Sequence, residues 1–198
     1  MKKRSGRSEG VRHRLLLAAD DLFTEKGFAN TGVREILKKS KVVPASFYDH
    51  FSSKEELVVA YLEQQKRKSI LDLKVLYRKS KNLKNFTKLW TQFRVDQISN
   101  SQYFGCPFIK FAYQSVDSSP ITINANKSIV EAWEKLLIQF MIKEYGDQLK
   151  VNAYKNTAKE ILIIYEGSIA IWMLCRDISV IKSMEKKFIN CLDNMLKN

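Results

Sequence analysis

Glycine and proline are scarce in this chain, with only 7 Gly and 3 Pro in 198 residues. These two residues most often end or break regular elements, so their scarcity favours long helices over a fold of many strands and turns. Apolar residues also recur at the spacing of a helix face, as Val11, Leu15, Ala18 and Leu22 do. The sequence therefore predicts an all-α protein.

The pattern predicts nine helices separated by short breaks. Pro44 suits the first turn of the third helix, where no N–H is needed, and Ser53 with Glu56 forms a capping box at the start of the fourth. The expected helices are about 9–26, Thr31 to about Lys39, Pro44 to about His50, Ser53 through Leu76, a fifth marked by Phe86 to Phe93, a sixth opened by Gly105-Cys106-Pro107, a seventh after Ser118-Ser119-Pro120 that Gly146 closes, 152–176 and 179–197.

Residues 23–62 contain the most specific motif. Gly27 can take the left-handed conformation that ends the first helix, Thr31 is expected to cap the second, and a tight turn leads to the third. A short third helix with buried Phe47 and Phe51 and small or polar residues outward suits insertion into a DNA major groove.

This arrangement resembles the N-terminal DNA-binding domain of the TetR family of transcriptional regulators. The resemblance implies a helix-turn-helix domain over residues 1–53, followed by a helical effector-binding and dimerisation domain over residues 54–198. It implies a DNA-binding regulator, acting as a repressor that leaves its operator when a small ligand binds or when Cys106 is modified.

The resemblance also assigns DNA contacts. Ala45 and Ser46 are expected to face base edges, and Tyr48 to reach a phosphate, although a partly buried packing role for Tyr48 is compatible with this. For Lys54 and His50 the alternatives are a solvated lysine and a neutral surface histidine. The predicted DNA-binding residues are Thr31, Arg34, Pro44, Ala45, Ser46, Tyr48, His50 and Lys54.

Some positions depart from the family pattern. Lys41 occupies the turn where glycine is usual, so a left-handed conformation there costs about 1 kcal/mol. Val43 replaces the usual Ser or Thr cap, and Pro44 with Ala45 replaces a common Lys-Gly pair. The fold tolerates these changes, but the operator sequence of relatives cannot be carried over.

Charge agrees with a nucleic-acid partner. The formal net charge is +13, and residues 1–54 hold 12 Lys and Arg against 6 Asp and Glu. Excess positive charge grips phosphates, although charge alone is equally compatible with a solvated basic surface.

Three cysteines, Cys106, Cys175 and Cys191, lack the spacing of a disulfide framework or metal site. With no signal peptide or membrane span apparent, we expect a cytoplasmic protein without cofactor or metal. Cys106 at a helix start, with Lys110 one turn on, would have a stabilised thiolate. This segment resembles the Gly-Cys-containing sixth helix of one branch of the family, which includes repressors that answer electrophiles and oxidants. The alternative is a small buried hydrophobe, and Cys175 and Cys191 are expected to be structural.

The second half is rich in aromatic residues at helical spacing, most of them expected in the core. A subset is expected to line an effector cavity between helices, for which we name Trp90, Phe93, Phe111 and Trp133 with Cys106 and Lys110. The last two helices are apolar enough to predict a homodimer through them.

Two other functions remain open: a sequence-independent architectural DNA binder, and an enzyme that uses Cys106. The first leaves the aromatic half without a purpose. The second lacks a partner base, because His13 and His50 both fall in the DNA-binding half. We therefore expect no enzymatic activity.

Overall fold

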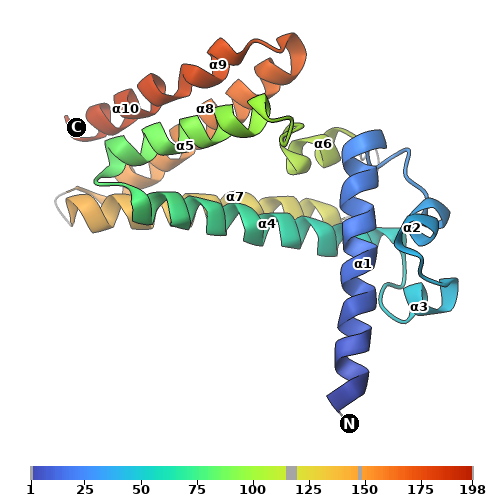
Figure 1. Cartoon of the computed structure of the whole chain (residues 1–198). Helices are drawn as coiled ribbons and strands as arrows, with labels where there is room; N and C mark the ends of the chain where they lie inside the picture. The colour runs from blue at the N-terminus through green and yellow to red at the C-terminus, as the bar shows by residue number, and fades with distance from the viewer. Residues whose placement is uncertain (1, 115–119, 147–148, 198) are drawn as a thin grey trace. The chain divides into compact units, whose positions relative to one another are not determined.

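The computed structural model describes residues 2–114, 120–146 and 149–197, and over these residues the backbone is helical with no strand (Figure 1). The predicted all-α class is confirmed. None of the described helices is both long and apolar enough to cross a membrane. The helices are α1 (Lys2–Lys26), α2 (Val33–Ser40), α3 (Pro44–Tyr48), α4 (Lys54–Lys79), α5 (Leu83–Ser99), α6 (Pro107–Gln114), α7 (Pro120–Tyr145), α8 (Val151–Cys175), α9 (Ile178–Lys182) and α10 (Met184–Met195).

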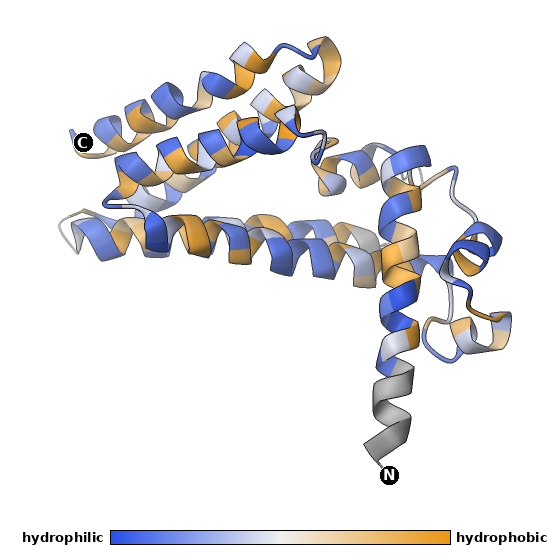
Figure 2. Cartoon of the chain, viewed as in Figure 1, coloured by the Kyte–Doolittle hydropathy of each residue, from blue (hydrophilic) through white to orange (hydrophobic). Residues whose placement is uncertain are grey.

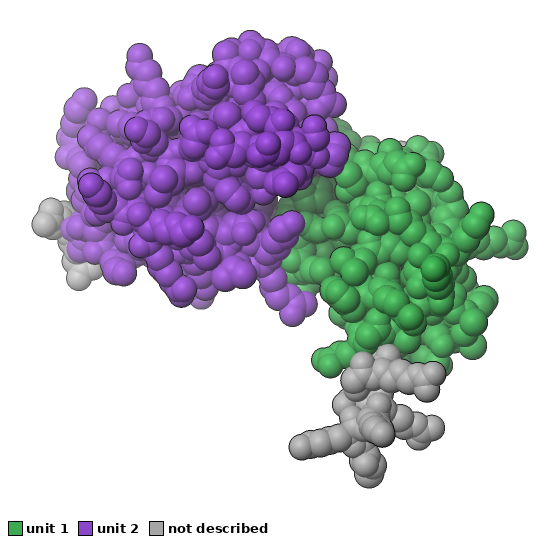
Figure 3. Space-filling view, viewed as in Figure 1, with its two compact units in different colours: residues 1–66, 107–127 green, residues 67–106, 128–198 purple. Residues whose placement is uncertain are grey.

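The chain divides into two compact units, drawn in two colours in Figure 3. Unit 1 comprises Met1–Lys66 and Pro107–Lys127, and unit 2 comprises Arg67–Cys106 and Ser128–Asn198. The boundaries fall within α4 and α7 and therefore differ from a division after residue 53. The functional domain limits stay a prediction.

The core of unit 1 is built on α1, which begins at Lys2, earlier than the predicted residue 9. Its buried face carries Leu15 and Phe23, as the helical spacing predicts. Gly27 ends the helix with a φ of 81° and donates its N–H to the Phe23 carbonyl at 3.1 Å. A side chain at Gly27 would also collide with Gln114, whose Oε1 accepts the Phe28 N–H at 2.6 Å. Gly27 is therefore required by both conformation and space.

The turn after α2 contains Lys41 in the left-handed region, with φ 54° and ψ 38°. The N–H of Val42 reaches the Leu37 carbonyl at 3.2 Å, and that of Lys41 reaches the Lys38 carbonyl at 3.4 Å. This pair of bonds is a Schellman motif, which satisfies carbonyls that a helix end otherwise leaves without donors. The predicted left-handed lysine is confirmed.

Helix α3 begins at Pro44, in the first-turn position predicted for it, and ends at Tyr48, two residues earlier than expected. Before α4, the Ser53 hydroxyl accepts the Glu56 N–H at 3.2 Å, which is one half of the predicted capping box. The other half is displaced: the Glu56 carboxylate accepts the N–H and hydroxyl of Ser52, at 2.6 and 2.7 Å. The carboxylate lowers its own desolvation cost equally well there, so the cap of α4 uses both serines.

Unit 2 packs α5, α8, α9 and α10 around stacked aromatic rings. The Trp90 ring lies 4.8 Å from that of Tyr165 and 5.1 Å from that of Phe188, measured between centroids. Along α5 in Figure 2, hydrophobic and hydrophilic residues alternate with the turns of the helix, as the sequence pattern predicts. The last predicted helix is divided into α9 and α10 at Ser183, whose hydroxyl bonds back to the Val180 carbonyl at 2.7 Å. Such back-bonding by serine competes with regular helix geometry.

Candidate nucleic-acid interface

The two sides of α3 differ sharply in exposure. Phe47 and Phe51 are buried, at 0% and 2% exposed, and their rings lie 5.9 Å apart. Tyr48 is 62% exposed, and Pro44 and Ala45 are also exposed. The buried rings fix the helix on unit 1 and leave a short outward face that a nucleic-acid groove can accept.

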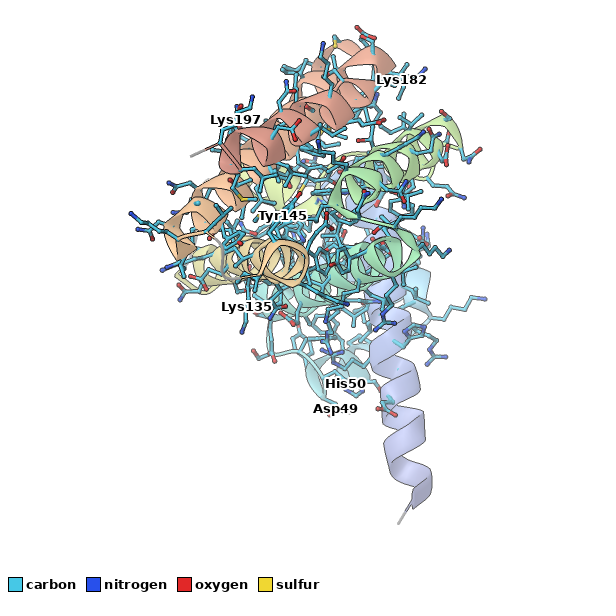
Figure 4. All side chains as sticks on the ribbon, turned by 90° about the vertical axis from the view of Figure 1, so that its left-hand side faces the viewer. Asp49, His50, Lys135, Tyr145, Lys182 and Lys197 are labelled. Atoms are coloured by element: carbon cyan, nitrogen blue, oxygen red, sulfur yellow. The ribbon has the colours of Figure 1, made fainter. Side chains whose placement is uncertain are left out.

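Two predicted base or phosphate contacts, Ser46 and His50, are half-buried. The His50 N–H bonds to the Phe47 carbonyl at 2.9 Å, so the turn after α3 holds the backbone of this residue. Figure 4 labels His50 and its neighbour Asp49 in this turn. Both side chains therefore sit at the C-terminal edge of the outward face.

Thr31 does not cap α2. The N-cap is Gly32, and Thr31 is 1% exposed with its hydroxyl donating to the Gly27 carbonyl at 2.7 Å. The correction has a physical reason, because a threonine hydroxyl turned back to close the α1 turn cannot also face the start of α2. Its side chain is not part of the exposed surface, whereas Arg34 on the first turn of α2 is exposed.

The start of α2 is held by an acidic residue instead. Glu35 accepts the Gly32 N–H at 3.1 Å and forms an ion pair with Lys26 at 2.6 Å. The hydrogen bond from Lys26, followed by that from Gly32, lowers the pKa of the Glu35 carboxyl. The backbone donor predicted to point at a phosphate is therefore already occupied at Gly32.

Lys54 points at the end of the α1 segment. Its Nζ donates to the Phe28 carbonyl at 2.6 Å, and partial burial lowers its pKa. The ammonium thus joins the start of α4 to the turn after α1. It retains further donors, so a phosphate contact by Lys54 stays a prediction.

Sequence reasoning missed two exposed residues on this surface. Val43, at the N-cap of α3, is 63% exposed, and Asp49, at its C-cap, is exposed as well. The sequence did carry a signal for Asp49, since it is the only acidic residue between Glu35 and Glu55.

The residues predicted to line an effector cavity do not converge. Phe111 packs in unit 1, with its ring 4.9 Å from that of Phe28. In unit 2, Trp133 is 8% exposed and donates its indole N–H to the Ser69 hydroxyl at 3.0 Å, while Phe93 is half-buried. Trp90 borders an apolar cavity of about 10 Å³, room for one water-sized sphere. That cavity is lined by Leu83, Phe86, Thr87, Trp90, Leu137, Met141, Ile161 and Leu192.

Cys106 directly precedes α6, as predicted, but it is only 3% exposed. Gly105 before it has a φ of 111°, and a side chain there would collide with Met173. The expected access of the thiol to solvent is therefore wrong for this conformation. Lys110 belongs to unit 1 and Cys106 to unit 2, so the predicted proximity of thiol and ammonium stays a prediction.

Around Cys106, unit 2 holds a cluster of buried polar side chains. The Arg94 guanidinium lies 3.8 Å over the ring of Tyr103 and donates to the Tyr165 hydroxyl. Burial raises the pKa of Glu166 to about 7, although the Cys106 thiol and the Arg94 charge act in the opposite direction. Neither Glu166 oxygen has a hydrogen-bond partner of ordinary geometry among the described residues. A buried carboxyl in this state favours its neutral form.

The other two cysteines differ from each other. Cys191 is 3% exposed, and burial, followed by the charge of Glu160, raises its pKa to about 12, which fits the expected structural role. Cys175 is exposed, contrary to that expectation. The reason is that Arg176 adopts a left-handed conformation and ends α8 there, so Cys175 lies on its last, open turn.

Helix α8 also carries an exposed apolar stripe. Ile163, Ile171 and Leu174 are 72%, 52% and 87% exposed. With Gly167 they are spaced four, four and three residues apart, which places all four on one face. A side chain at Gly167 would meet nothing within 4 Å. We call these four residues the α8 stripe.

Comparison with known proteins gives consistent results. Residues 15–61 match the family model of bacterial regulatory proteins, tetR family. A 63-residue segment is 33% identical to the HTH-type transcriptional regulator UidR of Escherichia coli (strain K12), and this segment covers 32% of each protein. The match thus spans about a third of the length of that relative.

Two solved structures share the fold over nearly the whole chain. The reduced form of E. coli NemR gives a TM-score of 0.81 at 22% identity, covering 91% of this chain and 95% of that one. SCO4454, a TetR-family transcriptional regulator from Streptomyces coelicolor, gives 0.75 at 21% identity, covering 96% and 95%.

Proposed function

Since the chain belongs to the TetR family through its N-terminal domain, we propose that it is a DNA-binding transcriptional regulator whose α3 enters the major groove of an operator. The observation that carries the proposal is the two-sided character of α3, with Phe47 fully buried and Tyr48 62% exposed. Positive charge in the first quarter of the chain supports it, because phosphate neutralisation supplies most non-specific affinity.

The exposed residues divide by role in this proposal. Tyr48 and Arg34 contact phosphates, Ala45 and Ser46 face base edges, and Pro44 fixes the front of the helix. Phosphate contacts position a protein on DNA without reading sequence, whereas base contacts specify it. His50 and Lys54 stand at the margins of this surface and add phosphate contacts when the groove closes over them.

The test compares Tyr48→Phe with Ser46→Ala. Tyr48→Phe removes one hydroxyl and is expected to weaken binding to all duplexes alike, while Ser46→Ala is expected to change which bases are preferred at one position per half-site. Binding curves on a selected operator and on unrelated DNA separate the two effects. Unchanged selectivity in Ser46→Ala, with altered selectivity in Tyr48→Phe, would contradict the division of roles.

We further propose that the protein binds as a homodimer through its last helices, with the α8 stripe as the apolar part of the contact. Three exposed aliphatic side chains beside a glycine give the surface of a close helix pair. A dimer would place two copies of α3 in successive major grooves, which requires a twofold-symmetric operator.

Release from DNA is proposed to follow either binding of a small ligand in unit 2 or modification of Cys106 by an electrophile or oxidant. The buried cluster of Arg94, Tyr103, Tyr165 and Glu166 around Cys106 supports the second route, because a modified thiol would have to displace these groups. The relatives named above are transcriptional regulators, and the proposal includes no enzymatic activity.

Alkylation tests this second route. Cys175 is expected to react with iodoacetamide faster than Cys106, because it is exposed and Cys106 is not. In a Cys175→Ser background, slow alkylation of Cys106 should then parallel loss of DNA binding, and Lys110→Met should slow that alkylation near neutral pH. If Cys106→Ser responds to the electrophile as the parent does, a reversible ligand is the effector.

A further inference from the structure

Asp49 is an unexpected residue on the proposed DNA-reading surface. It is the only acidic residue between Glu35 and Glu55, and it is exposed. Its N–H bonds to the Ala45 carbonyl at 3.0 Å, one turn back in α3. Ala45 and Asp49 therefore share the face of the helix that also presents Tyr48.

Local stability does not account for Asp49. A carboxylate at the C-terminal end of a helix faces the negative end of the helix dipole, which is unfavourable. No described residue forms an ion pair or side-chain hydrogen bond with the Asp49 carboxylate. By contrast, the nearby acidic residues Asp21 and Glu35 are each paired with a lysine.

On DNA, a carboxylate without a partner would be repelled by phosphates. The groups in the major groove that offset this cost are exocyclic amines, of which the N4 amine of cytosine is the usual partner of Asp and Glu. Tyr48 and Ala45, next to it on the face, supply no charge that could pair with it.

We infer that Asp49 is a specificity-determining residue, which accepts a hydrogen bond from the N4 amine of a cytosine in each operator half-site. The inference rests on the proposed function and extends it from DNA binding to one base of the operator. It places the cytosine at the step contacted by the C-terminal edge of α3, beyond the base facing Ala45.

The test is selection from a pool of random duplexes by the full-length wild-type protein and by Asp49→Asn. The variant keeps the shape of the side chain but adds a donor, and asparagine pairs with the N6 and N7 of adenine. We expect wild-type half-sites to contain a C·G pair at one fixed position, and Asp49→Asn to replace it with A·T there and nowhere else. On the wild-type operator the variant should bind about tenfold more weakly for one lost contact per half-site.

Glu25→Gln is the matched control. Glu25 is exposed on α1 and removes the same charge from unit 1 without touching α3. It should raise affinity for all duplexes and leave every base preference unchanged. The same bases enriched by wild type and Asp49→Asn at every position would overturn the inference while leaving the proposed function standing. A wild-type protein that enriches no motif would overturn both.

Discussion

At the scale of single residues, Lys41 shows a lysine held in a conformation that glycine adopts more easily. Its φ of 54° is imposed by the Schellman motif that ends α2. We expect Lys41→Gly to increase the free energy of unfolding by up to about 1 kcal/mol, because the backbone strain of a β-carbon disappears. Lys38→Gly, inside α2, should instead lower it by about 1 kcal/mol. Urea denaturation of both variants checks the prediction, and destabilisation by Lys41→Gly equal to that of Lys38→Gly would contradict it.

Glu166 predicts a pH dependence of folding stability. Its pKa is raised to about 7 in the folded protein by burial, so the folded state holds the proton more tightly than the unfolded chain does. Stability from this residue is therefore full below the unfolded value near 4.5 and is lost as pH rises through 7, by at most about 3 kcal/mol.

Glu166→Gln should flatten this part of the profile, since its amide has no proton to lose. The measurement is the denaturation midpoint of each protein between pH 5 and pH 8. Parallel profiles for wild type and Glu166→Gln would show that the carboxyl titrates normally.

At the scale of elements, sequence reasoning located helix ends wherever one residue decides the backbone. Gly27, Pro44 and Gly146 are of this kind, and each lies where expected, because a positive φ or a missing N–H leaves few alternatives. Thr31 and Cys175 were placed wrongly because their environments depend on contacts. The hydroxyl of Thr31 chose a carbonyl of α1, and the burial of Cys175 depended on where α8 stops.

The same distinction applies to the interface. The burial of Phe47 and Phe51 and the exposure of Ala45 follow from the short helical repeat. Burial of Cys106 could not be predicted, because the residues that cover its surroundings, Arg94 and Glu166, are distant in the sequence.

The α8 stripe carries the prediction for this scale. Ile163→Glu should convert the dimer to monomer, since a charge buried at a helix contact costs several kcal/mol, while the isolated chain keeps its fold because the site is exposed. Leu71→Glu is the control, because Leu71 is 58% exposed on α4 and outside the stripe. Sedimentation equilibrium reports the mass, and an unchanged dimer in Ile163→Glu would exclude the stripe as the contact.

At the scale of the whole molecule, the account joins a basic reading unit to an aromatic-cored unit through helices that the two units share. Unit 1 holds the outward face of α3, and unit 2 holds both the α8 stripe and the polar cluster around Cys106. Pairing, sensing and reading therefore belong to different surfaces of one chain. Substitutions at Ile163, Cys106 and Ser46 should consequently change mass, response and base preference separately.

The most direct test of this account is hydroxyl-radical footprinting of the protein on a duplex selected from a random pool. We expect two protected patches related by a twofold axis, with centres roughly 34–36 Å apart, one helical turn of DNA, and a complex containing two chains. A single protected patch, protection spread evenly along the duplex, or one chain per duplex would contradict the claim that this protein is a dimeric, sequence-reading regulator.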